Sequence, residues 1–252
     1  MNDNKEATDS TPLEMKVKEL EPLFVPHLDM IPELEPLMVH PEGMDTYSRI
    51  LESQCGSADD SQPVEMYDGS LGVSKQFVKK NQAPVGQLQW NDDLASKYAN
   101  PGNVSGVRWG SGTLISDDLF LTAGHCFDQT GGGWQRPREN GTGNIITHDE
   151  IAKNMHVNFN YQVDPNSNLR TEQSFPVTEL VEYRLGGLDF AIVRLGNNPG
   201  QSYGTTQVSP KDPSIKDIVC VIGHPAGQPK RIEAGDVDKL EGDYMGCARA
   251  QK

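Results

Sequence analysis

The sequence has 252 residues, of which 35% are hydrophobic, and a formal net charge of −14. This length suits one large β domain or a domain with an appendage. No stretch approaches the roughly 20 apolar residues of a membrane-spanning helix. No basic stripe exists that could neutralise nucleic-acid phosphates, so we expect neither nucleic acid nor a membrane as a partner.

The acidity lies almost entirely in the first 70 residues, which hold 16 of the 36 acidic and 4 of the 22 basic residues, together with seven prolines. Such a segment buries too little apolar area to offset its ordering entropy. We therefore predict an acidic, Pro-rich leader or pro-segment over residues 1–75 that is largely disordered. Within it, residues 19–25 and 33–39 share Glu-Leu-Glu-Pro-Leu. The repeat is either biased composition or a pair of amphipathic motifs that contact the following domain.

The N-terminus has no apolar h-region and no small-residue cleavage site, so no signal peptide is predicted and localisation stays open. From about residue 80, short alternating segments separated by Gly, Asn, Asp and Pro predict an all-β domain over residues 80–252. Leu88 and Trp90 alternate with polar residues, which is typical of a half-buried strand. Asp117 and Asp118 lie between two short strands and predict a tight hairpin. The other expected strands cover residues 112–116, 119–123, 155–163, 177–183, 189–195 and 218–222.

Residues 110–126 read Gly-Ser-Gly-Thr-Leu-Ile-Ser-Asp-Asp-Leu-Phe-Leu-Thr-Ala-Gly-His-Cys. This stretch resembles the region around the catalytic histidine of the chymotrypsin-like (trypsin-like) serine proteases. The resemblance implies that His125 is a general base, a role that suits its near-neutral pKa. Ala123 and Gly124 are expected to keep the wall behind the imidazole thin. The alternative is a structural histidine at a strand end.

Residues 186–195 read Gly-Gly-Leu-Asp-Phe-Ala-Ile-Val-Arg-Leu. In the same family an Asp-x-Ala-x-x-x-Leu strand supplies the triad aspartate, and this implies that role for Asp189. Because Asp189 opens an apolar run, we expect its side chain to be partly buried. A buried carboxylate needs a hydrogen-bond partner such as the Nδ1–H of a histidine. The alternative is a surface aspartate that caps a strand.

Residues 219–227, Val-Cys-Val-Ile-Gly-His-Pro-Ala-Gly, resemble a turn early in the second barrel of the bacterial glutamyl-endopeptidase branch. That branch also favours Gly-Ser-Gly-Thr-Leu-Ile ahead of the histidine. His224 is expected to be a loop residue. The resemblance implies a chymotrypsin-like double β-barrel, a polypeptide substrate, and no cofactor or metal. It also suggests a preference for Glu, and a family that is mostly secreted.

The nucleophile of this family is a serine in a Gly-x-Ser-Gly-Gly or Gly-x-Ser-Gly-Ser-Pro loop, well downstream of the aspartate. The one Gly-Ser-Gly here places Ser111 ahead of His125, on an expected core strand. Three serines that follow Asp189 lack the glycine bracket that an oxyanion hole requires; they are Ser202, Ser209 and Ser214. We expect the second barrel to be truncated, with a truncation or frameshift near residue 245, and this exact chain to be inactive.

The four cysteines are too few for a disulfide framework and form no C-x-x-C zinc motif; they are Cys55, Cys126, Cys220 and Cys247. Compared with the animal enzymes of the family, Cys126 lacks its upstream partner and is expected to be a free, buried thiol. Pairing of Cys220 with Cys247 stays open. His148 and His156 are eight residues apart and match no common metal-ligand pattern.

Two functions therefore compete. The first is a serine endopeptidase. The second is a non-catalytic protease-like binding or regulatory protein, whose acidic leader would be its interaction surface.

Overall fold

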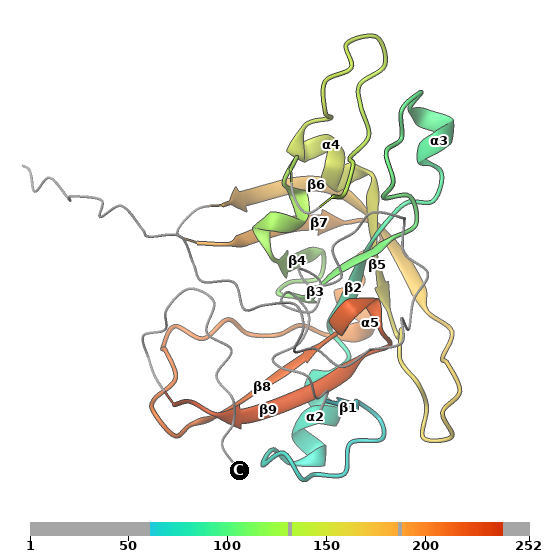
Figure 1. Ribbon diagram of the computed structural model, residues 1–252. Helices are drawn as coiled ribbons and strands as arrows, with labels where there is room; N and C mark the ends of the chain where they lie inside the picture. The colour runs from blue at the N-terminus through green and yellow to red at the C-terminus, as the bar shows by residue number, and fades with distance from the viewer. Residues whose placement is uncertain (1–60, 131–132, 186–187, 239–252) are drawn as a thin grey trace, which may run out of the picture. The chain divides into compact units, whose positions relative to one another are not determined.

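The computed structural model describes residues 61–130, 133–185 and 188–238 (Figure 1). The two Glu-Leu-Glu-Pro-Leu segments, Cys55 and Cys247 lie outside the described residues. Among the described residues, no helix has both the length and the apolar character needed to cross a bilayer.

Six antiparallel strands form a closed barrel in the order β2-β3-β4-β7-β6-β5, with β5 pairing back to β2. The expected hairpin is confirmed, because Leu114 pairs with Phe120 across the turn at Asp117 and Asp118. The barrel strands are β2 (Val85–Trp90), β3 (Arg108–Leu114), β4 (Leu119–Thr122), β5 (Met155–Phe159), β6 (Gln173–Arg184) and β7 (Phe190–Leu195).

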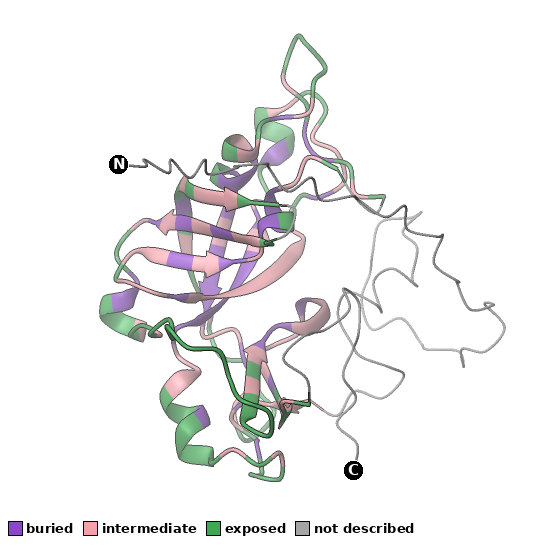
Figure 2. Ribbon diagram, turned by 90° about the vertical axis from the view of Figure 1, so that its left-hand side faces the viewer, coloured by how far each residue is buried: buried purple, intermediate pink, exposed green. Residues whose placement is uncertain are grey.

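The interior of the barrel is filled by the apolar residues that alternate along its strands. Leu88, Trp90 and Val157 are fully buried there, and the rings of Phe120 and Phe159 meet edge to face at 6.1 Å. Figure 2 shows this buried set running through the barrel. The period-two pattern of the sequence therefore identified the side chains that face the core.

Short helices connect these strands, and the described residues contain none longer than seven residues. They are α2 (Lys75–Asn81), α3 (Leu94–Lys97), η2 (Gly124–Phe127), α4 (His148–Lys153), α5 (Gly200–Tyr203) and η3 (Pro225–Gly227). α4 begins with a capping box formed by Thr147 and Glu150. It packs Ile151 and Ala152 into the barrel core.

Two expectations about the barrel strands are wrong. The strand expected over residues 155–163 ends at Phe159, because Asn160 has a φ of 64° and turns the chain. The outer face of β2 and β5 was expected to be exposed, yet Gln87 and Asn158 are fully buried. The Gln87 side-chain oxygen accepts hydrogen bonds from Asn158 and from Arg108. These polar side chains therefore satisfy one another on the outer face of the two strands.

A second, smaller sheet follows the barrel, and its described strands have the order β1-β9-β8. They are β1 (Gln62–Pro63), β8 (Ile218–Gly223) and β9 (Arg231–Asp236). The closed barrel and this smaller sheet match the expected all-β, chymotrypsin-like fold class.

The sheet has its own apolar cluster, made by Val64, Tyr67, Val78 and Ile232. Residues 61–75, which lie within the segment expected as a leader, are therefore part of the folded structure. Val64 and Tyr67 are each only 5% exposed, and such burial offsets the cost of ordering this segment.

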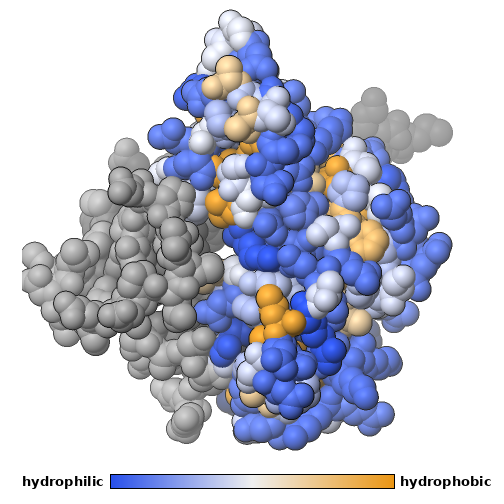
Figure 3. Space-filling view, turned by 90° about the vertical axis from the view of Figure 1, so that its right-hand side faces the viewer, coloured by the Kyte–Doolittle hydropathy of each residue, from blue (hydrophilic) through white to orange (hydrophobic). Residues whose placement is uncertain are grey.

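Polar contacts join the barrel to the second sheet. The backbone N–H of His224 donates to the Ser111 hydroxyl at 2.8 Å, and the N–H of Lys230 donates to the Tyr161 carbonyl at 2.8 Å. We call this contact the seam. The face of the molecule in Figure 3 is mostly hydrophilic, with small separated apolar spots.

Candidate active site

His125 lies in η2, the short turn that follows β4. β4 ends at Thr122, and η2 begins two residues later at Gly124. A Cβ atom on Gly124 would lie 2.2 Å from the carbonyl oxygen of Arg184 and 3.0 Å from that of Phe190. The glycine therefore lets η2 pack against the ends of β6 and β7. This differs from the expectation that the small residue thins the wall behind the imidazole.

Asp189 directly precedes β7, and the pairing of β4 with β7 brings it beside His125. In that register Thr122 pairs with Ala191, so the residues just beyond each strand end are neighbours. Nδ1 of His125 lies 2.6 Å from Oδ2 of Asp189, and the backbone N–H of His125 donates to Oδ1 at 2.8 Å. One carboxylate therefore holds both the ring and the backbone of the histidine.

This hydrogen bond sets the tautomer of the imidazole. A carboxylate only accepts, so Nδ1 carries the proton, and Nε2 is left as the basic nitrogen. The pair is more open than expected, because 64% of the His125 side chain and 43% of the Asp189 side chain are exposed. Asp189 lies just before the first residue of β7, and the preceding residue, Leu188, is 66% exposed. The buried part of this apolar run therefore begins only after Asp189.

The electrostatics of the pair favour its charged form. Partial burial raises the pKa of Asp189, but the hydrogen bonds from the ring and backbone of His125 outweigh it and bring that pKa below its usual value. The Cys126 side chain, and then the Asp189 carboxylate, raise the pKa of His125 above its ordinary value against the effect of burial. The carboxylate of Asp189 is in direct contact with the His125 ring, so the direction rests on Asp189.

Cys126 is a free thiol and only 2% exposed, as expected. A Cβ atom on Gly110 would lie 2.9 Å from its sulfur, so Gly110 occupies the place beside Cys126. Cys220 is also a free thiol.

The serines that the sequence singled out are not brought to His125. Ser111 lies on β3 with its hydroxyl at the seam, and the Ser209 hydroxyl bonds to the carbonyl of Lys211. In residues 61–130, 133–185 and 188–238, no serine hydroxyl donates to the His125 ring.

The two histidines considered for a metal are also held separately. Nδ1 of His148 lies 2.7 Å from the carbonyl oxygen of Phe127, and Nδ1 of His156 lies 2.7 Å from Oδ1 of Asn91. The part of the chain that the structure describes contains no group of three or more His, Cys, Asp or Glu side chains suited to a metal ion.

Sequence reasoning missed two buried titratable side chains at the seam, His224 and Lys230. His224 is a loop residue, as expected, but it is only 4% exposed, and its Nε2 has no hydrogen-bond partner among the described residues. Burial first, and then the positive charges of Lys230 and Arg108, lower the pKa of His224 to about 3. His224 is buried because it contacts Ser111 on β3, which lies far away in the sequence. No local sequence pattern could have predicted this burial.

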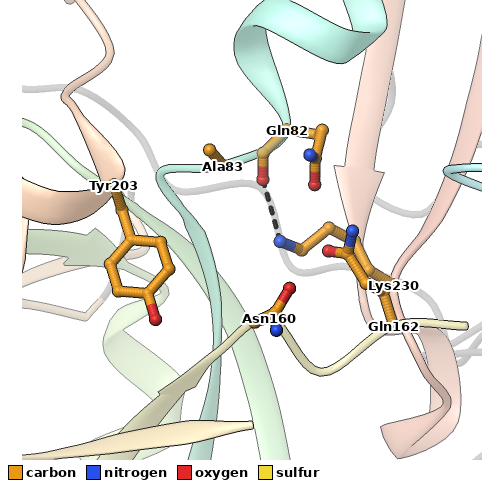
Figure 4. A pocket seen from close by; sticks show the side chains of 6 residues that line it. All are labelled: Gln82, Ala83, Asn160, Gln162, Tyr203 and Lys230. Carbon is orange, nitrogen blue, oxygen red and sulfur yellow. Dashed lines mark hydrogen bonds between the residues drawn. The ribbon is translucent and has the colours of Figure 1, made fainter. Parts of the chain in front are cut away.

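Lys230 is likewise 1% exposed, and its ammonium group donates to the carbonyl of Gln82, the C-cap of α2, at 2.8 Å (Figure 4). Burial lowers the pKa of Lys230 to about 7, although Glu65 acts in the opposite direction. The group borders a pocket of about 80 Å³ lined by Gln82, Ala83, Asn160, Gln162, Tyr203 and Lys230.

The comparisons with known proteins point to one family. A family model described as a trypsin-like peptidase domain matches residues 110–251. The match starts within β3 and includes both His125 and Asp189. No curated protein matches the chain.

Proposed function

The chain belongs to the trypsin-like peptidase family, and from this premise we propose that His125 and Asp189 are two members of a serine-type catalytic triad. One observation carries the proposal: Nδ1 of His125 lies 2.6 Å from Asp189, which leaves Nε2 as the basic nitrogen. The family implies a hydrolase that acts on polypeptide substrates. The reaction in this proposal is acyl transfer from a peptide bond.

Each residue has a defined part in that reaction. Nε2 of His125 takes the proton of a serine hydroxyl as its oxygen attacks the scissile carbonyl, and later gives that proton to the leaving amine. Asp189 fixes the Nδ1–H tautomer and stabilises the imidazolium that forms. Water then hydrolyses the acyl-enzyme, with His125 again accepting a proton.

The proposed pair can be tested without any turnover. A strongly deshielded NMR resonance from Nδ1–H of His125 is expected in the wild-type chain and should vanish in Asp189→Asn. The pKa of His125 should fall toward its ordinary value in the same variant, because the amide carries no charge. A resonance and a pKa that are unaffected by Asp189→Asn would remove the pair from the proposal.

We further propose that a polypeptide of the printed 252 residues has negligible peptidase activity. The support is that Ser111, the serine of its one Gly-Ser-Gly, is engaged at the seam by the N–H of His224. A fluorophosphonate probe with intact-mass readout should label no serine. Labelling of one serine that is lost in His125→Ala would contradict inactivity while supporting the role of His125.

The alternative is a protease-like protein that binds polypeptides without cleaving them, and the engagement of Ser111 favours it. Peptides that shift the His125 ring signals without being cleaved would support this function.

The finer assignment to the glutamyl-endopeptidase branch rests on residues 110–115 and 219–227. It predicts that peptides containing Glu shift these signals more than matched peptides containing Gln.

We also propose that the chain comprises an acidic leader and a peptidase domain. The expected parts are residues 1–75 and 80–252. Because Val64 and Tyr67 pack in the apolar cluster of the second sheet, we propose that the folded domain also includes residues 61–75. Limited proteolysis should then leave a core that retains Val64 and Tyr67. A stable core that retains residues 19–39 would instead support a leader bound to the domain.

A further inference from the structure

The turn that carries His125 is held by side chains from three separate segments. The backbone carbonyls of residues 126–128 accept, in order, from Nε1 of Trp109 at 2.9 Å, Nδ1 of His148 at 2.7 Å and Nε of Arg136 at 3.0 Å. A single turn of 3₁₀ helix has few hydrogen bonds of its own. These external donors therefore fix where η2, and with it the imidazole of His125, lies.

Of the three donors, His148 also contacts the strand beside Asp189. Its ring stacks on Tyr183 with centroids 4.5 Å apart and an angle of 28° between the planes. Tyr183 belongs to β6 and pairs with Ala191 of β7, two residues beyond Asp189. Tyr183 also interacts electrostatically with the carboxylate of Asp189. Burial, and then the charges of Asp128 and Asp189, raise the pKa of Tyr183.

We infer that His148 is a positioning residue that braces His125 and Asp189 against each other. It does so by bonding to the turn of one and stacking on the strand next to the other. The inference rests on the proposed function, since it assigns His148 a part in the same site. His148 itself contacts no reacting atom in this scheme.

The bond from His148 fixes which ring nitrogen carries a proton. The Phe127 carbonyl can only accept, so Nδ1 carries the proton that is donated. The bond is therefore a geometric constraint on the position of η2.

We expect α4 to keep its fold when His148 is replaced. The helix is capped by Thr147 and Glu150 and anchored in the core by Ile151 and Ala152, and none of these contacts uses the His148 ring. Phe at position 148 keeps an aromatic ring for the stack and removes the donor. His148→Asn places an amide nitrogen at the position of the histidine Nδ1, whereas His148→Gln places it near the position of Nε2.

The test follows His125 by NMR in the full chain. In His148→Phe, we expect the deshielded Nδ1–H resonance of His125 to be lost or shifted and its pKa to fall by about one unit, because the bond to Asp189 lengthens. His148→Asn should restore both readouts toward wild type. Tyr183→Phe, which keeps the stacked ring, should change neither.

An unchanged resonance and pKa in folded His148→Phe would overturn the brace. If that variant fails to fold, the comparison of Asn with Gln decides, and equal readouts for the two would overturn it as well. Failure of the proposed function looks different. In that case Asp189→Asn leaves the wild-type resonance untouched, whatever residue stands at position 148.

Discussion

Gly124 shows how one missing methyl group allows the candidate site to form. A side chain there would meet the Arg184 carbonyl at 2.2 Å, and a backbone oxygen cannot move aside as a flexible side chain can. We expect Gly124→Ala to lower the free energy of unfolding by about 3 kcal/mol, at the high end of overpacking costs. Urea unfolding measures it. Gly196→Ala is the control, because its Cβ would meet side-chain atoms alone, the Pro176 ring at 3.2 Å and Cγ2 of Thr178 at 3.6 Å. Equal losses in both variants would contradict the steric argument.

The sulfur of Cys126 offers a second test at the residue scale. The distance of 2.9 Å from a Cβ on Gly110 is close to the roughly 3 Å between a Cβ and the far sulfur of a disulfide. Gly110→Cys should therefore form a disulfide with Cys126 on oxidation. The closed loop of roughly 15 residues should stabilise the fold by about 3 kcal/mol. A loss of two hydrogens in mass, with a Tm that falls on reduction, would show it. Two thiols that both stay reactive after oxidation would contradict it.

At this scale, the resemblance of two local sequence patterns to a known family selected His125 and Asp189. The small residues before His125 and the apolar run after Asp189 are local patterns, and the structure brings the two side chains together. The exposure of Asp189 could not be predicted in this way. Exposure depends on which distant segments cover a strand end, and no local pattern carries that information.

At the scale of elements, the position of α2 depends on the buried side-chain nitrogen of Lys230. Lys230, one residue before β9, donates to the C-cap carbonyl of α2 and so ties that helix to the second sheet. The folded pKa of about 7 lies below the unfolded value of 10.5. Between these values only the unfolded chain binds the proton, so stability rises with pH at about 1.4 kcal/mol per unit from this group.

Lys230→Met should remove that rise, because its thioether does not titrate. Urea unfolding of both proteins at pH 7 and pH 9 gives the comparison. The gain in stability of the wild type between these values should exceed that of the variant. Parallel changes in the two proteins would show that Lys230 keeps its ordinary pKa and that the burial argument is wrong.

Burial alternates along β4 and β7, as a period of two in the sequence predicts. The hairpin was predictable because it has turn residues at its centre. What the pattern could not reveal is the covering of the outer face of β2 and β5. Gln87 and Asn158 are polar residues at outward positions, and alternation alone assigns such residues to solvent. Their burial comes from partners far along the chain, which no window of neighbouring residues contains.

At the scale of the whole molecule, acid should open the seam between barrel and sheet. His224 has an unfolded pKa near 6.5 and a folded pKa of about 3, and it faces Lys230 and Arg108, which are also positive. The contribution of the neutral His224 ring to the free energy of unfolding is therefore fully present above pH 6.5. It is lost as the pH falls toward 3, at about 1.4 kcal/mol per unit.

His224→Phe should flatten this acid dependence, because the ring on Tyr161 is retained while the titrating group is removed. The Tm of both proteins from pH 7 to pH 4 measures the effect. The wild type should lose more stability over this interval than the variant. An equal loss would place the acid-sensitive group elsewhere in the molecule.

The pairing of β1 with β9 has a consequence for how the chain folds during synthesis. Ser61 bonds to Arg231, 170 positions later, and Gln62 pairs with Ile232. At roughly 5–20 residues per second, a ribosome needs on the order of 10–30 seconds to make the intervening chain. The barrel, complete by residue 195, can close within that time, while Val64 and Tyr67 still lack Ile232. The second sheet is therefore expected to assemble last, and a pause in translation after residue 195 would leave a closed barrel with the first strand of that sheet unpaired.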